Sequence, residues 1–198
     1  CDDVAQGFVD VALVNPLAVV GSTAGVPHYL ATVFHDGSRF LMYYMNEGAA
    51  SGVNHAVAES QDGLSWTQLA GAAFGPGTTG LNYNYSADVG FDSDEYHVFI
   101  AAATGGGTAT DIFHGKSFDA DSFPSGSLSL AKGTAGAFDG RGVHQPVVAW
   151  SGGKWHLFYA GNPASGSPDT IGYASTVGLE TWARHGMVLG LGSGYDGD

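Results

Sequence analysis

Short runs of hydrophobic and aromatic residues alternate with glycine-rich turns along most of the chain. Examples of such runs are Leu41–Tyr44, His97–Ile100 and His156–Tyr159. Their length and aromatic content are typical of strands, and no segment keeps a 3.6-residue hydrophobic period with helix caps. The pattern therefore predicts an all-β protein in which the Gly and Pro clusters form the turns.

The strand pattern repeats three times. Phe40, Tyr96 and Trp155 open the matching aromatic runs, and the first and third copies close on Trp66 and Trp182. A four-stranded antiparallel blade buries its faces only against neighbouring blades, so the repeat predicts a β-propeller. We expect three blades, at about 26–75, 80–133 and 137–190. The N-terminal segment, residues 1–25, is a candidate for closing strands.

The third copy is followed by the start of another one. The tail Tyr195–Gly197 repeats the lead-in Phe138–Gly140 of the third copy, whereas propellers have about four to eight blades. We therefore expect the outward face of the third blade, near Trp155, Phe158 and Tyr173, to need a cover. Missing blades, the N-terminal segment or a protein partner would supply it.

Composition excludes several classes of protein. The 198 residues are 44% hydrophobic, and their 6 basic and 19 acidic side chains give a net charge of −13. No hydrophobic run reaches the roughly 18 residues of a membrane span. The few Lys and Arg residues are scattered, whereas a nucleic-acid-binding surface needs them clustered. Neither a membrane span nor a nucleic-acid partner is expected.

The single cysteine, Cys1, precludes an intrachain disulfide. A Cys in first position resembles the start of a mature bacterial lipoprotein, where it carries the lipid. That interpretation predicts an extracytoplasmic protein tethered to a membrane through Cys1. The alternative is an unmodified residue at an arbitrary boundary.

The third copy carries a family resemblance. Its segments His144–Val148, Gly153–Gly161, Ile171–Ser175 and Gly178–Trp182 resemble the blades of five-bladed furanosidase-type glycoside hydrolases. These are families 43 and 32 and their relatives, the arabinanase, levansucrase and invertase group. The resemblance is strong in the third copy, fair in the first and weak in the second. It implies a five-bladed propeller with its active site at the mouth of the central channel.

The resemblance also implies acidic residues on the innermost strands, where two carboxyl groups cleave the glycosidic bond together. This sequence departs from the family there. The matching column holds neutral residues, each followed by another neutral one: Leu30-Ala31, Ser86-Ala87 and Gln145-Pro146. The family's catalytic residues therefore cannot be transferred to any position of this chain.

Two acids remain weak candidates for catalysis. Asp88 lies two residues after Ser86, so on a strand both side chains point to the same side. Glu47 ends the second strand of the first copy. For both residues the competing interpretation is a solvated or capped side chain without a catalytic role.

A second column, beside the missing acids, holds Tyr29, Tyr85 and His144. Rings with polar tips at a propeller mouth stack on sugar faces, and Gln145 would add a hydrogen bond. These four residues are the candidate ligand-binding set, and the competing interpretation is packing between blades.

No cofactor or metal is expected. His97 and His156 recur at the same place in the aromatic strand, and this regularity indicates a structural hydrogen bond. The acids around Asp92 fall in a hairpin turn, and the pair Asp119 and Asp121 lacks the remainder of a calcium loop.

Three functions stay open. The first is a non-catalytic propeller that acts as a structural or interaction module, such as a peripheral subunit of a membrane-associated assembly. The second is a furanosidase-type glycoside hydrolase acting on arabinose-, xylose- or fructose-containing glycans, with its acids on blades outside this chain. The third is a carbohydrate-binding propeller. The neutral inner column favours the first.

Overall fold

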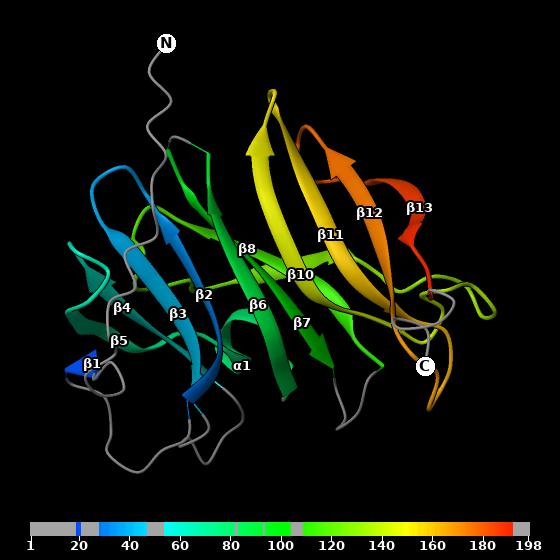
Figure 1. Cartoon of the computed structure of the whole chain (residues 1–198), viewed down its shortest axis with the longest axis horizontal. Coiled ribbons are helices and arrows are strands. Elements are labelled where there is room, and N and C mark those ends of the chain that lie inside the picture. Colours follow the sequence, from blue (N-terminus) through cyan, green and yellow to red (C-terminus); the bar gives the residue numbers. More distant parts are fainter. Residues whose placement is uncertain are drawn as a thin grey trace.

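A computed structural model of the chain describes residues 19–20, 28–46, 54–81, 83–92, 94–103 and 109–191. Three sheets stand side by side, each built on four consecutive antiparallel strands (Figure 1). Blade 1 contains β2 (His28–His35), β3 (Phe40–Asn46), β4 (Asn54–Ser60) and β5 (Trp66–Phe74). Blade 2 contains β6 (Tyr83–Phe91), β7 (Tyr96–Ala103), β8 (Asp111–Ser117) and β9 (Gly126–Leu130). Blade 3 contains β10 (Gly142–Ser151), β11 (Lys154–Asn162), β12 (Thr170–Thr176) and β13 (Ala183–Leu189).

The predicted all-β fold of consecutive four-stranded blades is confirmed. Among the described residues, two short elements lie outside the repeat. Strand β1 (Val19–Val20) pairs in parallel with β5 at the edge of blade 1, and helix α1 (Pro76–Thr79) connects blades 1 and 2. The innermost strands β2, β6 and β10 lie next to one another at the centre of the fan (Figure 1).

The aromatic residues of the repeat occupy equivalent positions. Phe40, Tyr96 and Trp155 each stand at the start of the second strand of their blade. Each pairs with a residue at the end of the first strand, as Tyr96 does with Phe91 and Trp155 with Trp150. The repeat found in the sequence is therefore the structural repeat.

Side chains of β7 point alternately towards blade 1 and towards blade 3. Val98 and Ile100 face blade 1 and share a core with Leu41 and Tyr43. Phe99, between them, points the other way and packs against blade 3. Because successive residues of a strand face opposite sides, β7 contributes to both cores.

The prediction that Trp155, Phe158 and Tyr173 share the outward face of blade 3 is wrong for Trp155. Trp155 is 1% exposed and packs against His97 and Phe99 of blade 2. Phe158 is 43% exposed and stacks on Tyr173. Trp155 and Phe158 are three positions apart on β11. An odd separation along a strand places their side chains on opposite faces of the sheet.

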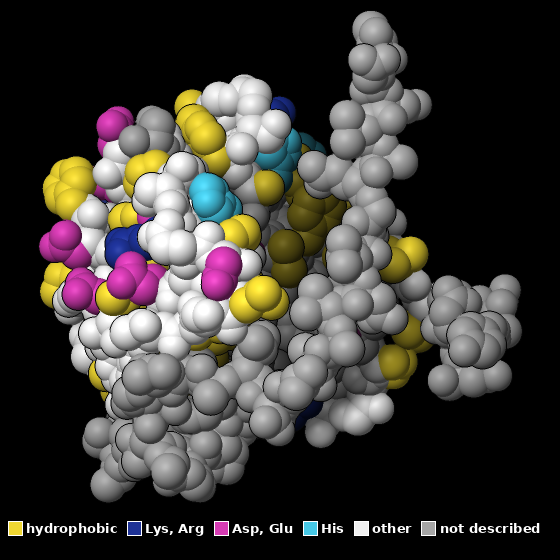
Figure 2. Space-filling model, turned by 60° about the vertical axis from the view of Figure 1, so that its left-hand side comes forward, with side chains coloured by type: hydrophobic (Ala, Val, Ile, Leu, Met, Phe, Trp, Pro, Cys, Tyr) yellow, Lys and Arg dark blue, Asp and Glu magenta, His cyan; other side chains and the backbone are white. Residues whose placement is uncertain are grey.

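Acidic side chains outnumber Lys and Arg on the visible face of the molecule, as the composition requires (Figure 2). Within the described ranges, no helix has the length and hydrophobicity needed to cross a membrane.

Candidate functional site

Each innermost strand carries an irregularity at the same level. The pairing register shifts between Tyr29 and Thr32 in β2, between Asn84 and Ala87 in β6, and between His144 and Val147 in β10. Such bulges bend a strand and redirect its side chains, and they are common beside binding sites.

The three bulges enclose a depression of about 240 Å³ at the centre of the fan. We call it the central depression. It is lined by Ala31, Thr32, Ser86, Ala87, Asp88, Gln145, Pro146 and Val147. Each innermost strand contributes, and among these lining residues Asp88 is the single acid. Ser86 and Gln145, two of the three residues of the neutral column, are thus brought together here, and the side chain of the third, Leu30, lies outside the description.

Asp88 is buried where the three blades meet. Its Oδ1 accepts a hydrogen bond of 2.5 Å from Thr32 Oγ1 of blade 1. Its Oδ2 accepts one of 2.8 Å from the backbone N–H of Val148 in blade 3. Burial raises the pKa of Asp88, although both hydrogen bonds oppose this shift. The carboxyl group of Asp88 therefore links the three blades. Its buried surroundings shift its ionisation towards the protonated form.

Gln145 lies on the rim of the depression with its side chain exposed. Its φ of 47° is in the left-handed region, which is unfavourable for a residue with a Cβ. The backbone N–H of Gln145 donates a 2.7 Å hydrogen bond to Ser86 Oγ, and this contact holds the bulge to blade 2. The strained backbone presents a neutral amide, which donates and accepts hydrogen bonds but does not ionise.

The other candidate residues are placed elsewhere or lie outside the described residues. Tyr85 stacks on Tyr83, with ring centroids 6.4 Å apart, and does not line the central depression. His144 Nε2 lies 3.3 Å from Asp169 Oδ2, in the loop of its own blade. The side chain of Tyr29 and the whole of Glu47 and Cys1 lie outside the description.

His97 and His156 make equivalent structural hydrogen bonds, as their regular spacing predicted. His97 Nδ1 lies 2.9 Å from His114 Nε2, and His156 Nδ1 lies 2.7 Å from the hydroxyl of Tyr173. Across the described ranges there is no cluster of three or more His, Cys, Asp or Glu side chains suited to a metal ion.

Sequence reasoning missed Thr32 and Val148, the two partners of Asp88. Thr32 is an unremarkable residue in a hydrophobic strand, and Val148 takes part through its backbone. The available signal was the repeat itself, because Thr32 and Asp88 fall in the same column when the three copies are aligned.

Comparison with known proteins supports the fold. No family model matches the sequence, and no curated protein matches it. Among solved structures, a thermostable family-43 glycoside hydrolase superposes with a TM-score of 0.68 and 18% identity, over 83% of this chain and 56% of that one. The endo-arabinase of Bacteroides thetaiotaomicron gives 0.65 and 12%, over 81% and 61%. The β-1,2-mannobiose phosphorylase of Listeria innocua gives 0.67 and 18%, over 83% and 46%.

These similarities confirm the resemblance to furanosidase-type glycoside hydrolases in architecture. The chain has the fold of part of such a propeller and spans about half the length of the structures it matches.

Proposed function

We propose that the chain is the glycan-binding part of a glycoside-hydrolase-type propeller, and that its three blades do not hydrolyse glycosides by themselves. Glycans containing arabinose, xylose or fructose are the first ligands to test, since a family-43 glycoside hydrolase and an endo-arabinase share the fold. The sugar would lie in the central depression, against Ser86 and the amide of Gln145.

One observation carries this proposal. The central depression combines neutral polar groups with a single carboxyl group, that of Asp88, whose two oxygens already accept hydrogen bonds from the protein. Glycosidases use two carboxyl groups, about 5 to 10 Å apart, of which one attacks or activates water and the other protonates the leaving oxygen. Both oxygens of Asp88 accept hydrogen bonds from the neighbouring blades. The depression is therefore equipped to hold a sugar and lacks a described partner for acid–base chemistry.

The test is calorimetric titration of the protein with soluble arabinan, xylan and inulin, together with turnover assays on aryl arabinofuranosides and aryl xylosides. Gln145→Ala should weaken binding about fivefold, the effect of one lost hydrogen bond. Gln61→Ala, an exposed glutamine in the turn between β4 and β5, is the matched control and should bind normally. Absence of binding to every glycan contradicts the proposed ligand. Turnover that disappears in Asp88→Asn contradicts the proposed lack of chemistry.

A glycoside hydrolase in which further blades supply the second carboxyl group is the alternative, and Asp88 favours it. A general acid at neutral pH needs a raised pKa, and burial raises that of Asp88. In a longer form of the protein, hydrolysis abolished by Asp88→Asn, with glycan binding intact, would support this alternative.

The outer face of blade 3 supports a role in a larger propeller. On blade 2, His97, Phe99 and His114 form the surface that receives Trp155. The equivalent residues of blade 3 are His156, Phe158 and Tyr173, with Phe158 and Tyr173 at the 4.9 Å spacing of Phe99 and His114. We propose that a further blade of the same protein inserts an aromatic side chain there.

A further inference from the structure

A second hollow lies between blades 2 and 3, near the C-terminal ends of β6 and β10. Its volume is about 690 Å³, within the range of roughly 300–1,000 Å³ in which small ligands bind. We call it the interblade groove. Its lining shares no residue with the central depression, so the two sites can be tested separately.

The walls of the groove offer an aromatic platform and scattered polar groups. Trp150 is 39% exposed and is held in place by Trp155, with ring centroids 5.4 Å apart. Ser127 and Glu180 are exposed on opposite walls, from β9 and from the loop before β13. A flat, half-exposed indole beside hydroxyl and carboxylate groups suits a ligand with one apolar face and polar edges.

A partly buried chain of hydrogen bonds lines the groove. Asp92 Oδ2 lies 3.1 Å from His97 Nε2, and His97 Nδ1 lies 2.9 Å from His114 Nε2. His97 donates a hydrogen bond from Nε2–H to the carboxylate of Asp92, so its Nδ1 accepts one from His114 Nε2–H. His114 Nδ1 is then an acceptor. Burial lowers the pKa of both histidines, that of His114 to about 4, so the chain is uncharged beyond Asp92 at neutral pH.

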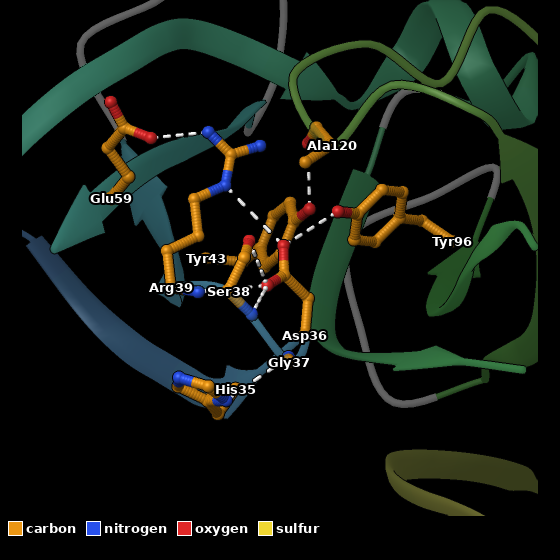
Figure 3. A network of polar contacts seen from close by, with 9 residues as sticks. All are labelled: His35, Asp36, Gly37, Ser38, Arg39, Tyr43, Glu59, Tyr96 and Ala120. Carbon is orange, nitrogen blue, oxygen red and sulfur yellow. Dashed lines mark hydrogen bonds and ion pairs between the residues drawn. The ribbon is translucent and has the colours of Figure 1, made fainter. Parts of the chain in front are cut away.

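The equivalent joint between blades 1 and 2 is bridged differently (Figure 3). There the hydroxyl of Tyr96 donates a 2.8 Å hydrogen bond to Asp36, which also contacts Arg39. Arg39 in turn pairs with Glu59. This network links the turn of blade 1 to the second strand of blade 2.

In the second joint the corresponding positions hold Asp92, Glu95, Lys116 and Trp155. The ion pair is reversed in sign, with Lys116 Nζ 2.8 Å from Glu95 Oε2. Trp155 has no hydroxyl with which to reach Asp92, and its ring is buried against His97 and Phe99. The groove lies where the Tyr96 bridge would otherwise be. It is therefore a property of these side chains and not of the blade repeat.

We propose that the interblade groove binds a neutral sugar unit of a glycan, stacked on Trp150 and hydrogen-bonded by Ser127 and Glu180. The lining carries three acids and one Lys, which disfavours phosphate, sulfate and uronic acids. Lys116 compensates the charge of Glu95, whereas Asp92 is hydrogen-bonded to an uncharged His97. The carboxylate of Glu180 is exposed and accepts hydrogen bonds, which suits a neutral ligand rich in hydroxyl groups. The stacking surface of Trp150 favours the flat face of a sugar ring over a cationic peptide.

The inference is tested by titrating the protein with arabinan and xylan while the fluorescence of its Trp residues is followed. Trp150→Ala should weaken the binding followed by this signal about tenfold, and Trp150→Phe should retain most of it because a ring remains. Ser127→Arg, at an exposed position of β9, should obstruct the groove without touching the core. Phe118→Ala, another exposed aromatic that does not line the groove, should bind normally.

The results separate the two sites. Unchanged binding in both Trp150→Ala and Ser127→Arg overturns the groove proposal, and if Gln145→Ala still weakens binding, the central depression stands. Loss of binding in the groove variants alone supports the groove and contradicts the central depression. Trp150-dependent binding of oligolysine in place of glycans overturns the sugar assignment in favour of a cationic peptide.

Discussion

Thr32 in blade 1 donates a hydrogen bond of 2.5 Å to the carboxyl group of Asp88 in blade 2. The two residues hold equivalent positions, because Thr32 pairs with Tyr43 and Asp88 pairs with Phe99 in their respective second strands. The other oxygen of Asp88 is bound by the backbone of Val148 in blade 3. One side chain at the base of the candidate site therefore holds three blades together.

Two substitutions of Asp88 distinguish the contribution of its charge to stability from that of its hydrogen bonds. Asp88→Ala leaves Thr32 and the N–H of Val148 without an acceptor and should lower the free energy of unfolding by about 1–3 kcal/mol. Asp88→Asn keeps an acceptor and the shape of the group, so its cost should be smaller. Urea denaturation of the two variants measures the difference. Equal losses would contradict a role for these hydrogen bonds.

The same residue predicts a pH effect with a definite sign. Burial raises the pKa of Asp88 in the folded protein, so the folded state binds its proton more tightly than the unfolded state. The resulting stabilisation is complete below the unfolded pKa of about 3.9 and is lost as the pH rises through the folded value. Wild type should therefore lose stability relative to Asp88→Asn over that window. Parallel curves of melting temperature against pH would refute the shift.

His55 should contribute the opposite dependence. It is 1% exposed and stacks on Phe74 at 4.5 Å, and burial lowers its pKa from 6.5 to about 4. The unfolded chain therefore takes up the proton first as the pH falls. The stability that His55 contributes is present above 6.5 and is lost as the pH falls towards 4.

His55→Phe keeps the stacked ring and removes the titration. Its melting temperature should fall less than that of wild type between pH 6.5 and 4. His114, whose pKa is lowered to about 4 in the same way, should preserve part of the dependence in this variant.

The repeat made the blades predictable from sequence, whereas the roles of individual side chains depended on contacts between copies. Strand alternation and the recurring aromatics specify where each blade begins, because both are local properties of the chain. The partners of Asp88 are 56 and 60 residues away, and no local pattern encodes them. The face of Trp155, in contrast, is a local property, because its separation of three residues from Phe158 places the two side chains on opposite sides of β11.

Gly90 explains how Trp155 fits between the blades. A Cβ built on Gly90 would lie 2.6 Å from the ring of Trp155. Gly90→Ala should therefore force the indole or β6 to move and lower the free energy of unfolding by about 1–3 kcal/mol. Gly178→Ala, where a Cβ meets nothing within 4 Å, is the control. Equal stabilities of the two variants would show that the contact between blades 2 and 3 tolerates a displaced Trp155 and would contradict this prediction.

The proposed cover of blade 3 is testable with a matched pair of phenylalanines. Phe99 is completely buried by blade 3, whereas its equivalent Phe158 is 43% exposed. Phe99→Ala should cost about 3–5 kcal/mol of unfolding free energy in the 198-residue chain. Phe158→Ala should cost clearly less there, because 43% of Phe158 is already exposed to solvent.

In a form of the protein that includes a further blade, Phe158→Ala should cost as much as Phe99→Ala, because an inserted aromatic would bury both rings alike. Denaturation of the two variants in both forms makes the comparison. If Phe158→Ala costs no more in the longer form than in the shorter one, the outer face of blade 3 is not a blade interface. If it instead abolishes self-association of the shorter chain in sedimentation experiments, a second copy covers this face and the proposed further blade is wrong.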